Sequence, residues 1–127
     1  MDFLSFELEQ FPKEYFLAWT VTTQCRYKVS VTLKVGNTVY FQAEKRDADT
    51  NLQILSQDSR IHDCEGTPVL TIKVNESTKL KQSLTSGAIN DLRARKVGYV
   101  YDFCIEDSED DDFNDVYVNI VGWAKKG

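Results

Sequence analysis

The sequence predicts an all-β fold, an antiparallel β-sandwich of about nine short strands that forms a single domain over residues 1–127. First, apolar and polar residues alternate through much of the chain, as in residues 29–33, and this period of two is typical of strands with one buried face. Second, turn-forming residues such as Gly36-Asn37 separate these segments at short intervals. Third, a length of 127 residues suits one domain.

Alternating apolar residues mark most of the expected strands: Phe6/Leu8, Phe16/Ala18, Val29/Val31/Leu33, Val39/Phe41 and Leu70/Ile72/Val74. Two further strands follow turn-forming residues 46–49 and 75–76, and the last two flank an acidic run. Together these signals predict strands at residues 4–9, 15–23, 27–34, 39–44, 52–57, 69–74, 79–85, 97–106 and 115–123. Trp19 and Trp123 lie in strand-like segments and are expected in the core. Residues 88–95 are the one place where the sequence favours a helical turn.

Composition excludes several classes of function. The apolar fraction of 42% and the aromatic fraction of 12% argue against disorder. The chain has neither a basic stripe suited to nucleic acid nor an apolar run of the ~18 residues that a membrane span needs. Its first residues lack the features of a signal peptide, so we expect synthesis in the cytoplasm and, if the protein is released, a non-classical route.

The cysteines and the single histidine give no strong functional signal. Cys25, Cys64 and Cys104 are widely spaced and form no C-x-x-C pair, so we expect reduced, partly buried thiols. His62 lies two residues before Cys64, but this proximity in sequence does not establish a Cys–His nucleophile pair. We therefore expect no catalysis there.

The most informative segment is residues 106–115, in which seven of ten side chains are carboxylates and none is basic. The net charge of the chain is −5, and removing these seven negative charges from −5 leaves +2 for the rest of the chain, so the acidity is local. Because strand-like sequence flanks the run on both sides, crowding these carboxylates is costly unless a cation neutralises them. Calcium, which takes several oxygen ligands, is the natural candidate.

Spacing and charge refine this prediction. Asp110, Asp112 and Asn114 alternate as in the first half of an EF-hand loop, but the sixth and twelfth positions hold Asp115 and Val121 instead of glycine and glutamate, which excludes an EF-hand. The expected carboxylate ligands carry five negative charges, so two calcium ions neutralise them better than one. These ligands are Glu106, Asp107, Asp110, Asp112 and Asp115. The alternatives are a solvated acidic hairpin without metal and a calcium ion that only rigidifies the loop.

The run Glu106-Asp107-x-x-Asp110-x-Asp112-Phe113-Asn114-Asp115 precedes an apolar strand and a segment that contains Trp123 and ends at Gly127. This arrangement resembles the two-calcium, fucose- and mannose-binding bacterial lectins, whose pattern is E-D-G-x-D-x-D-Y-N-D. Phe113 replaces the family's tyrosine and Ser108 its glycine.

The resemblance implies a nine-stranded antiparallel sandwich that binds two calcium ions and a sugar and assembles as a homodimer or tetramer. It assigns the calcium ions to Glu106, Asp107, Asp110, Asp112, Asn114 and Asp115, with the carboxylate of Gly127 reaching the site of a neighbouring protomer. It assigns sugar contacts to Thr22, Thr23 and Gln24 in the loop after the second strand, together with Asp107, Asp110 and Asp112.

The chain departs from this family in the loop after the second strand, where the family's asparagine ligand and its small sugar-contacting residues lie, and in the C-terminal segment. The loop after the second strand reads Thr22-Thr23-Gln24-Cys25 and lacks the family's asparagine ligand. The C-terminal segment is about two residues longer, lacks the family's proline and contains Lys125 and Lys126. Sugar binding therefore depends on positions outside the acidic run.

The leading hypothesis is a calcium-dependent, non-enzymatic lectin for fucose- or mannose-type carbohydrate. The alternative is a lectin-fold protein that keeps calcium for structure, has lost or altered sugar binding, and acts as a protein-interaction module. A glycosidase with paired carboxylates is a third class, and the crowding of seven carboxylates without an isolated acid argues against it.

Overall fold

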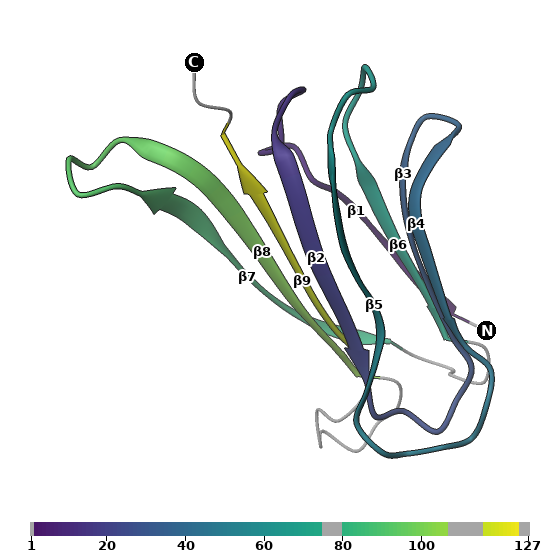
Figure 1. Ribbon diagram of the computed structural model, residues 1–127. Coiled ribbons are helices and arrows are strands. Elements are labelled where there is room, and N and C mark those ends of the chain that lie inside the picture. Colours follow the sequence, from purple (N-terminus) through teal and green to yellow (C-terminus); the bar gives the residue numbers. More distant parts are fainter. Residues whose placement is uncertain (1, 75–79, 107–115, 125–127) are drawn as a thin grey trace.

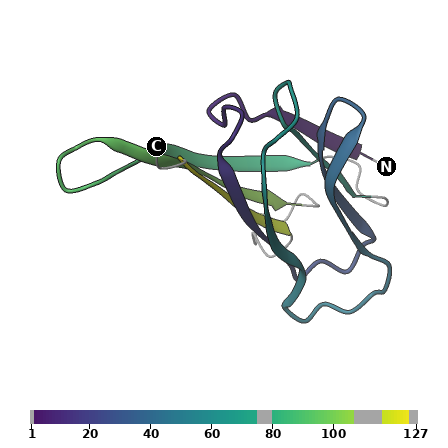
Figure 2. The same ribbon diagram turned by 45° about the horizontal axis from the view of Figure 1, so that its top comes forward.

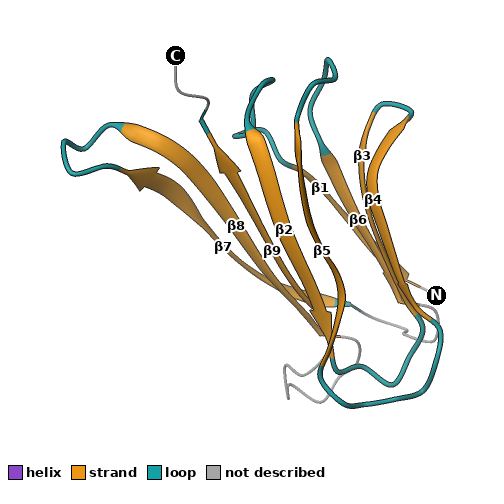
Figure 3. Cartoon of the chain, in the orientation of Figure 1, coloured by secondary structure: helices purple, strands orange, loops and turns teal. Residues whose placement is uncertain are grey.

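The computed structural model describes residues 2–74, 80–106 and 116–124, and this part of the chain contains strands and no helix. Figures 1 and 3 show the strands arranged in two antiparallel sheets. The described strands are β1 (Asp2–Glu7), β2 (Phe16–Thr23), β3 (Val29–Val35), β4 (Thr38–Lys45), β5 (Gln53–Ile61), β6 (Val69–Val74), β7 (Lys81–Asn90), β8 (Lys96–Glu106) and β9 (Val116–Trp123). Within these described ranges there is no helix with the length and apolar character needed to cross a bilayer.

The two sheets contain four and five strands. The four-stranded sheet has the order β1-β6-β3-β4, and the five-stranded sheet has the order β5-β2-β9-β8-β7. The chain therefore crosses between sheets several times before the last three strands complete the five-stranded sheet. This arrangement places β9, which follows the acidic run, between β2 and β8.

Side chains that alternate along the strands fill the space between the sheets. On β2, Leu17, Trp19 and Val21 are buried, while the residues between them are half-buried on the outer face. Aromatic pairs join the two layers: Trp19 stacks on Phe41 of β4 with ring centroids 4.8 Å apart. Such pairs contribute stability beyond the burial of apolar area.

The predicted nine-stranded sandwich is confirmed, and the boundaries differ most at exposed strands. β5 continues to Ile61 and β7 to Asn90, beyond the expected ends at residues 57 and 85. Both are edge strands of the five-stranded sheet. Their side chains are largely exposed. The sequence of these strands therefore shows little alternation of apolar and polar residues, and backbone pairing determines where they end.

The expected helical turn at residues 88–95 is wrong. Residues up to Asn90 continue β7, and Asn90 pairs with Lys96 at the start of β8. The tip between them is a tight turn, in which the backbone N–H of Ala94 donates to the carbonyl of Asp91 at 3.0 Å. The Asp91 carboxylate accepts the backbone N–H groups of Arg93 and Arg95, at 2.8 and 3.0 Å. These bonds lower the pKa of Asp91.

The hairpin of β7 and β8 reaches beyond the four-stranded sheet, as Figure 2 shows. Leu84 on β7 is consequently 45% exposed.

The expected burial of the two tryptophans is half correct: Trp19 is buried, whereas Trp123 is 42% exposed at the end of β9. Trp123 alternates with buried Gly122 and therefore lies on the outer face of the five-stranded sheet.

Candidate functional site

Strand pairing brings the flanks of the acidic run and the predicted sugar loop to one end of the five-stranded sheet. Thr23, the last residue of β2, pairs with Val116 at the start of β9. Val116 also pairs with Ile105, which precedes Glu106 at the end of β8. In Figure 1 this is the lower end of the sandwich. Two segments about 80 residues apart in sequence therefore meet at one place.

Glu106 is the described residue that most directly indicates a cation. Glu106 is the last residue of β8, and because neighbouring side chains in a strand point to opposite faces, it lies on the outer face while Ile105 lies in the core. It is nevertheless only 1% exposed. Within the described part of the chain, neither of its carboxylate oxygens has a hydrogen-bond partner. A buried carboxylate without partners is costly. Oxygen ligands are what calcium prefers, so this side chain fits the ligand role predicted for it.

The other predicted calcium ligands lie outside the described residues: Asp107, Asp110, Asp112, Asn114, Asp115 and Gly127. Among the residues that are described, no group of three His, Cys, Asp or Glu side chains gathers around a common point.

Of the predicted sugar contacts in the loop after the second strand, Thr22 and Thr23 instead end β2, and Gln24 follows the strand. Internal hydrogen bonds hold this segment. Thr23 is fully buried, and its hydroxyl accepts the backbone N–H of Cys25 at 3.1 Å. Thr22 is half-buried on the outer face. Gln24 Nε2 donates to the hydroxyl of Tyr117 on β9 at 2.9 Å. The loop is therefore tied both to its own backbone and to the strand that follows the acidic run.

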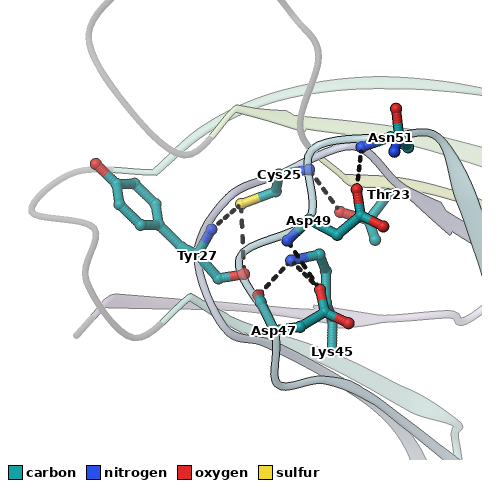
Figure 4. Close-up of polar contacts among 7 residues, drawn as sticks. All are labelled: Thr23, Cys25, Tyr27, Lys45, Asp47, Asp49 and Asn51. Atoms are coloured by element: carbon teal, nitrogen blue, oxygen red, sulfur yellow. Dashed lines mark hydrogen bonds and ion pairs between the residues drawn. The ribbon is translucent and has the colours of Figure 1, made fainter.

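A second loop, residues 46–52, lies beside the segment that contains Cys25 and Tyr27, as Figure 4 shows. Lys45 is buried, and its ammonium bonds the backbone carbonyl of Asp47 at 2.5 Å and the Asp47 carboxylate at 3.0 Å. The Asp47 carboxylate also accepts the backbone N–H of Asp49 at 3.0 Å. The Lys45 hydrogen bond is the main cause that lowers the pKa of Asp47. A lysine ammonium therefore acts as the counter-ion of this loop.

A hollow of about 310 Å³ lies on the outer face of the five-stranded sheet and begins at this end. Hydroxyl, amide and carboxylate groups on four strands line much of it: Thr20, Thr22, Ser83, Thr85, Asp102, Tyr117 and Asn119. Asn119 donates to the Asp102 carboxylate at 2.5 Å. Tyr117 could not be predicted from the sequence, because its place beside Gln24 and Thr22 depends on strand register.

His62 is buried at the opposite end of the sandwich, and both of its ring nitrogens contact groups other than the Cys64 thiol. Its Nε2 lies 3.1 Å from the carbonyl of Gly66, and its Nδ1 lies 2.7 Å from the hydroxyl of Tyr40. The thiol of Cys64 instead lies 3.6 Å from the Asp63 carboxylate. No disulfide joins the three cysteines within the described part of the chain, and Cys25 is buried while Cys64 and Cys104 are half-buried.

The two-sheet fold is similar to the folds of solved bacterial lectins. One similar structure is the C-terminal domain of the lectin BC2L-C from Burkholderia cenocepacia, with a TM-score of 0.64, 17% identity and 96% of each chain covered. Another is the Chromobacterium violaceum lectin CV2L in complex with α-methyl-fucoside, with a TM-score of 0.61, 19% identity and 96% of each chain covered.

The high-affinity mannose-binding lectin from Ralstonia solanacearum is also similar, with a TM-score of 0.63, 17% identity and 96% of each chain covered. By sequence, the chain matches no protein-family model and no curated protein. The resemblance to fucose- and mannose-binding bacterial lectins therefore holds at the level of the fold.

Proposed function

We propose that this protein is a calcium-dependent lectin that binds fucose- or mannose-type carbohydrate and has no enzymatic activity. The observation that carries the proposal is Glu106, a buried carboxylate without partners among the described residues, located where the acidic run begins. It lies at the same sheet end as residues 22–24. Support also comes from two similar structures, one a lectin in complex with α-methyl-fucoside and the other a high-affinity mannose-binding lectin.

In this proposal, six residues of the acidic run hold the calcium ions: Glu106, Asp107, Asp110, Asp112, Asn114 and Asp115.

 Two ions suit this set, because each carboxylate adds one negative charge and one ion would leave most of that charge unbalanced. When bound, calcium supplies open coordination positions that accept vicinal sugar hydroxyls. In this proposal Asp107, Asp110 and Asp112 also contact the sugar.

The chain's own polar groups orient the ligand. Thr22 and Gln24 offer a hydroxyl and an amide at the edge of the site, and the buried Thr23 keeps the loop in place through its bond to the Cys25 backbone. We also propose a homo-oligomer, a dimer or a tetramer, in which the carboxylate of Gly127 from one protomer completes the site of another.

A second candidate is a lectin-fold protein-interaction module in which calcium is structural. The loop after β2 lacks the family's asparagine ligand, and the Gln24 amide is already bonded to Tyr117. Isothermal titration separates the two candidates, because calcium binding without a response to methyl-mannoside or methyl-fucoside favours the interaction module.

A glycan array probed with calcium and with EDTA tests the leading proposal. We expect binding to fucose- or mannose-containing glycans that disappears in EDTA and returns when calcium is restored. Binding that is insensitive to EDTA, or no binding to any glycan in calcium, would contradict the proposal.

A further inference from the structure

We propose that Tyr117 is a positioning residue of the sugar site, whose hydroxyl holds the Gln24 side chain in the orientation that the ligand meets. This inference rests on the proposed lectin function and adds a residue to it. Tyr117 is the second residue of β9, two positions after Asp115 at the end of the acidic run. One short stretch of chain therefore carries both a proposed calcium ligand and this phenol.

Strand register places Tyr117 beside the sugar loop. It pairs with Thr22 of β2 on one side and with Cys104 of β8 on the other. Its side chain lines the outer hollow, together with Thr22. Its hydroxyl accepts a hydrogen bond from the Gln24 side-chain amide at 2.9 Å, and the two residues are 93 positions apart in sequence. The phenol thus links the strand that leaves the acidic run to the loop that follows β2.

This bond restricts a side chain that is otherwise long and flexible. An unbound glutamine side chain samples several rotamers, and a ligand that contacts it must order it. Because the amide nitrogen donates to the phenol, the amide oxygen points away from Tyr117 and is suited to accept a hydrogen bond from a sugar hydroxyl. If the amide is rotated by 180°, the phenol donates to the oxygen and the nitrogen becomes the group that faces the ligand. In both orientations Tyr117 fixes one end of the amide and leaves the other for recognition.

The location of Tyr117 allows its role in positioning Gln24 to be distinguished from a purely structural role. Its neighbours Val116 and Val118 are buried in the core, whereas Tyr117 is half-buried on the outer face. Replacing the phenol by a phenyl ring removes one oxygen and leaves the core residues unchanged. Loss of the hydrogen bond can therefore be measured with little change in packing.

The test is isothermal titration of α-methyl-fucoside and α-methyl-mannoside into the calcium-saturated protein and its Tyr117→Phe variant. We expect affinity to fall roughly three- to tenfold, the effect typical of one hydrogen bond, while the calcium-induced rise in melting temperature stays unchanged. Tyr99→Phe is the matched control, because the Tyr99 hydroxyl bonds Ser86 at 3.3 Å in the β7–β8 hairpin. It should bind sugar like the unsubstituted protein.

A double-mutant cycle with Gln24→Leu identifies the route of the effect. If Tyr117 acts through Gln24, Tyr117→Phe causes no further loss in the Gln24→Leu background. An equal loss in both backgrounds, or unchanged sugar affinity in Tyr117→Phe, would overturn this inference and leave the lectin function standing. A reduced calcium-induced melting shift in Tyr117→Phe would also overturn it. Failure of the unsubstituted protein to bind either sugar would overturn both proposals.

Discussion

At the scale of single residues, Glu106 carries the most information about the site. A carboxylate that is 1% exposed, with no hydrogen-bond partner within the described ranges, is expected to destabilise the protein in the absence of a cation. The same carboxylate stabilises the protein once a cation is bound. Removing its charge should therefore change stability in opposite directions with and without calcium.

Glu106→Gln tests this reversal. In EDTA we expect the melting temperature to stay constant or rise, because a buried charge is replaced by a neutral amide, a change on the order of 1 kcal/mol. In calcium we expect a much smaller melting shift than the unsubstituted protein shows. Differential scanning fluorimetry measures both. Glu9→Gln, at an exposed loop position, is the control and should preserve the full calcium shift; a full shift in Glu106→Gln would remove Glu106 from the ligand set.

His62 gives a second prediction at this scale. The Gly66 carbonyl can only accept, so Nε2 carries the proton and Nδ1 accepts from the Tyr40 hydroxyl. Burial disfavours the charged imidazolium and so lowers the pKa of His62 from its usual value of 6.5. The unfolded chain then binds a proton more readily than the folded protein just below that pH, so stability falls as pH decreases through this range.

Urea unfolding in EDTA at pH 7.5 and pH 5.5 measures this dependence. His62→Gln should lose less stability between the two pH values than the unsubstituted protein, because the titrating group is gone. Carboxylates with lowered pKa values, such as Asp63 and Asp91, add to the loss of stability only in the more acidic range near and below 3.8. An identical pH dependence in both proteins would show that His62 is not the responsible group.

At the scale of elements, the contact between β8 and β9 positions both ends of the acidic run. Gly98 of β8 pairs with Trp123 of β9. A Cβ atom at Gly98 would lie 2.6 Å from the backbone carbonyl oxygen of Gly122. A backbone atom in a strand cannot move away without disturbing the ladder, so no side chain larger than hydrogen fits there.

Gly98→Ala is expected to destabilise the protein by about 1–3 kcal/mol, the usual cost of overpacking. Chemical denaturation measures the change. Gly87→Ala on β7 is the matched control, because a Cβ atom there meets nothing within 4 Å; it should differ from the unsubstituted protein by no more than a few tenths of a kcal/mol. Equal stability of the two variants would contradict the close approach of β8 and β9.

The strands that the sequence predicts well are those with one buried face. β3 and β6 alternate apolar and polar residues, and their buried positions lie in the core as expected. β5 and β7 are edge strands with largely exposed side chains. Their lengths follow from backbone pairing with β2 and β8, which no local pattern encodes. The misassigned helical turn at residues 88–95 has the same cause.

The candidate site, like the fold, could be predicted from the sequence only in part. Glu106 could be predicted as a ligand because the acidic run is continuous in sequence. The contact of Tyr117 with Gln24 could not be predicted from the sequence, because it joins residues 93 positions apart and depends on the register of β2 against β9. The pairing of Lys45 with Asp47 was missed because a buried lysine at a strand end carries no distinctive sequence signal.

At the scale of the whole molecule, the fold brings the loop after β2 and both flanks of the acidic run to one end of the five-stranded sheet. The β7–β8 hairpin extends away from the sandwich (Figure 2). The proposed oligomer would add the carboxylate of Gly127 to this end from a second copy.

Deletion of Gly127 from the 127-residue chain tests that part of the proposal. We expect weaker sugar binding, by roughly tenfold or more, because the terminal carboxylate then belongs to Lys126 and lies one residue short of the site, with little change in the melting temperature measured in EDTA. Titration calorimetry and fluorimetry give the two readouts. Unchanged sugar affinity would show that Gly127 does not take part in the site.

The central claim is that calcium held by the acidic run creates the sugar site. Sequential isothermal titration tests it most directly, first with calcium into the metal-free protein and then with α-methyl-fucoside or α-methyl-mannoside into the product. We expect two calcium ions per protomer, and sugar binding that is present after the first titration and absent in EDTA. Sugar binding by the metal-free protein, or no calcium binding at all, would contradict it.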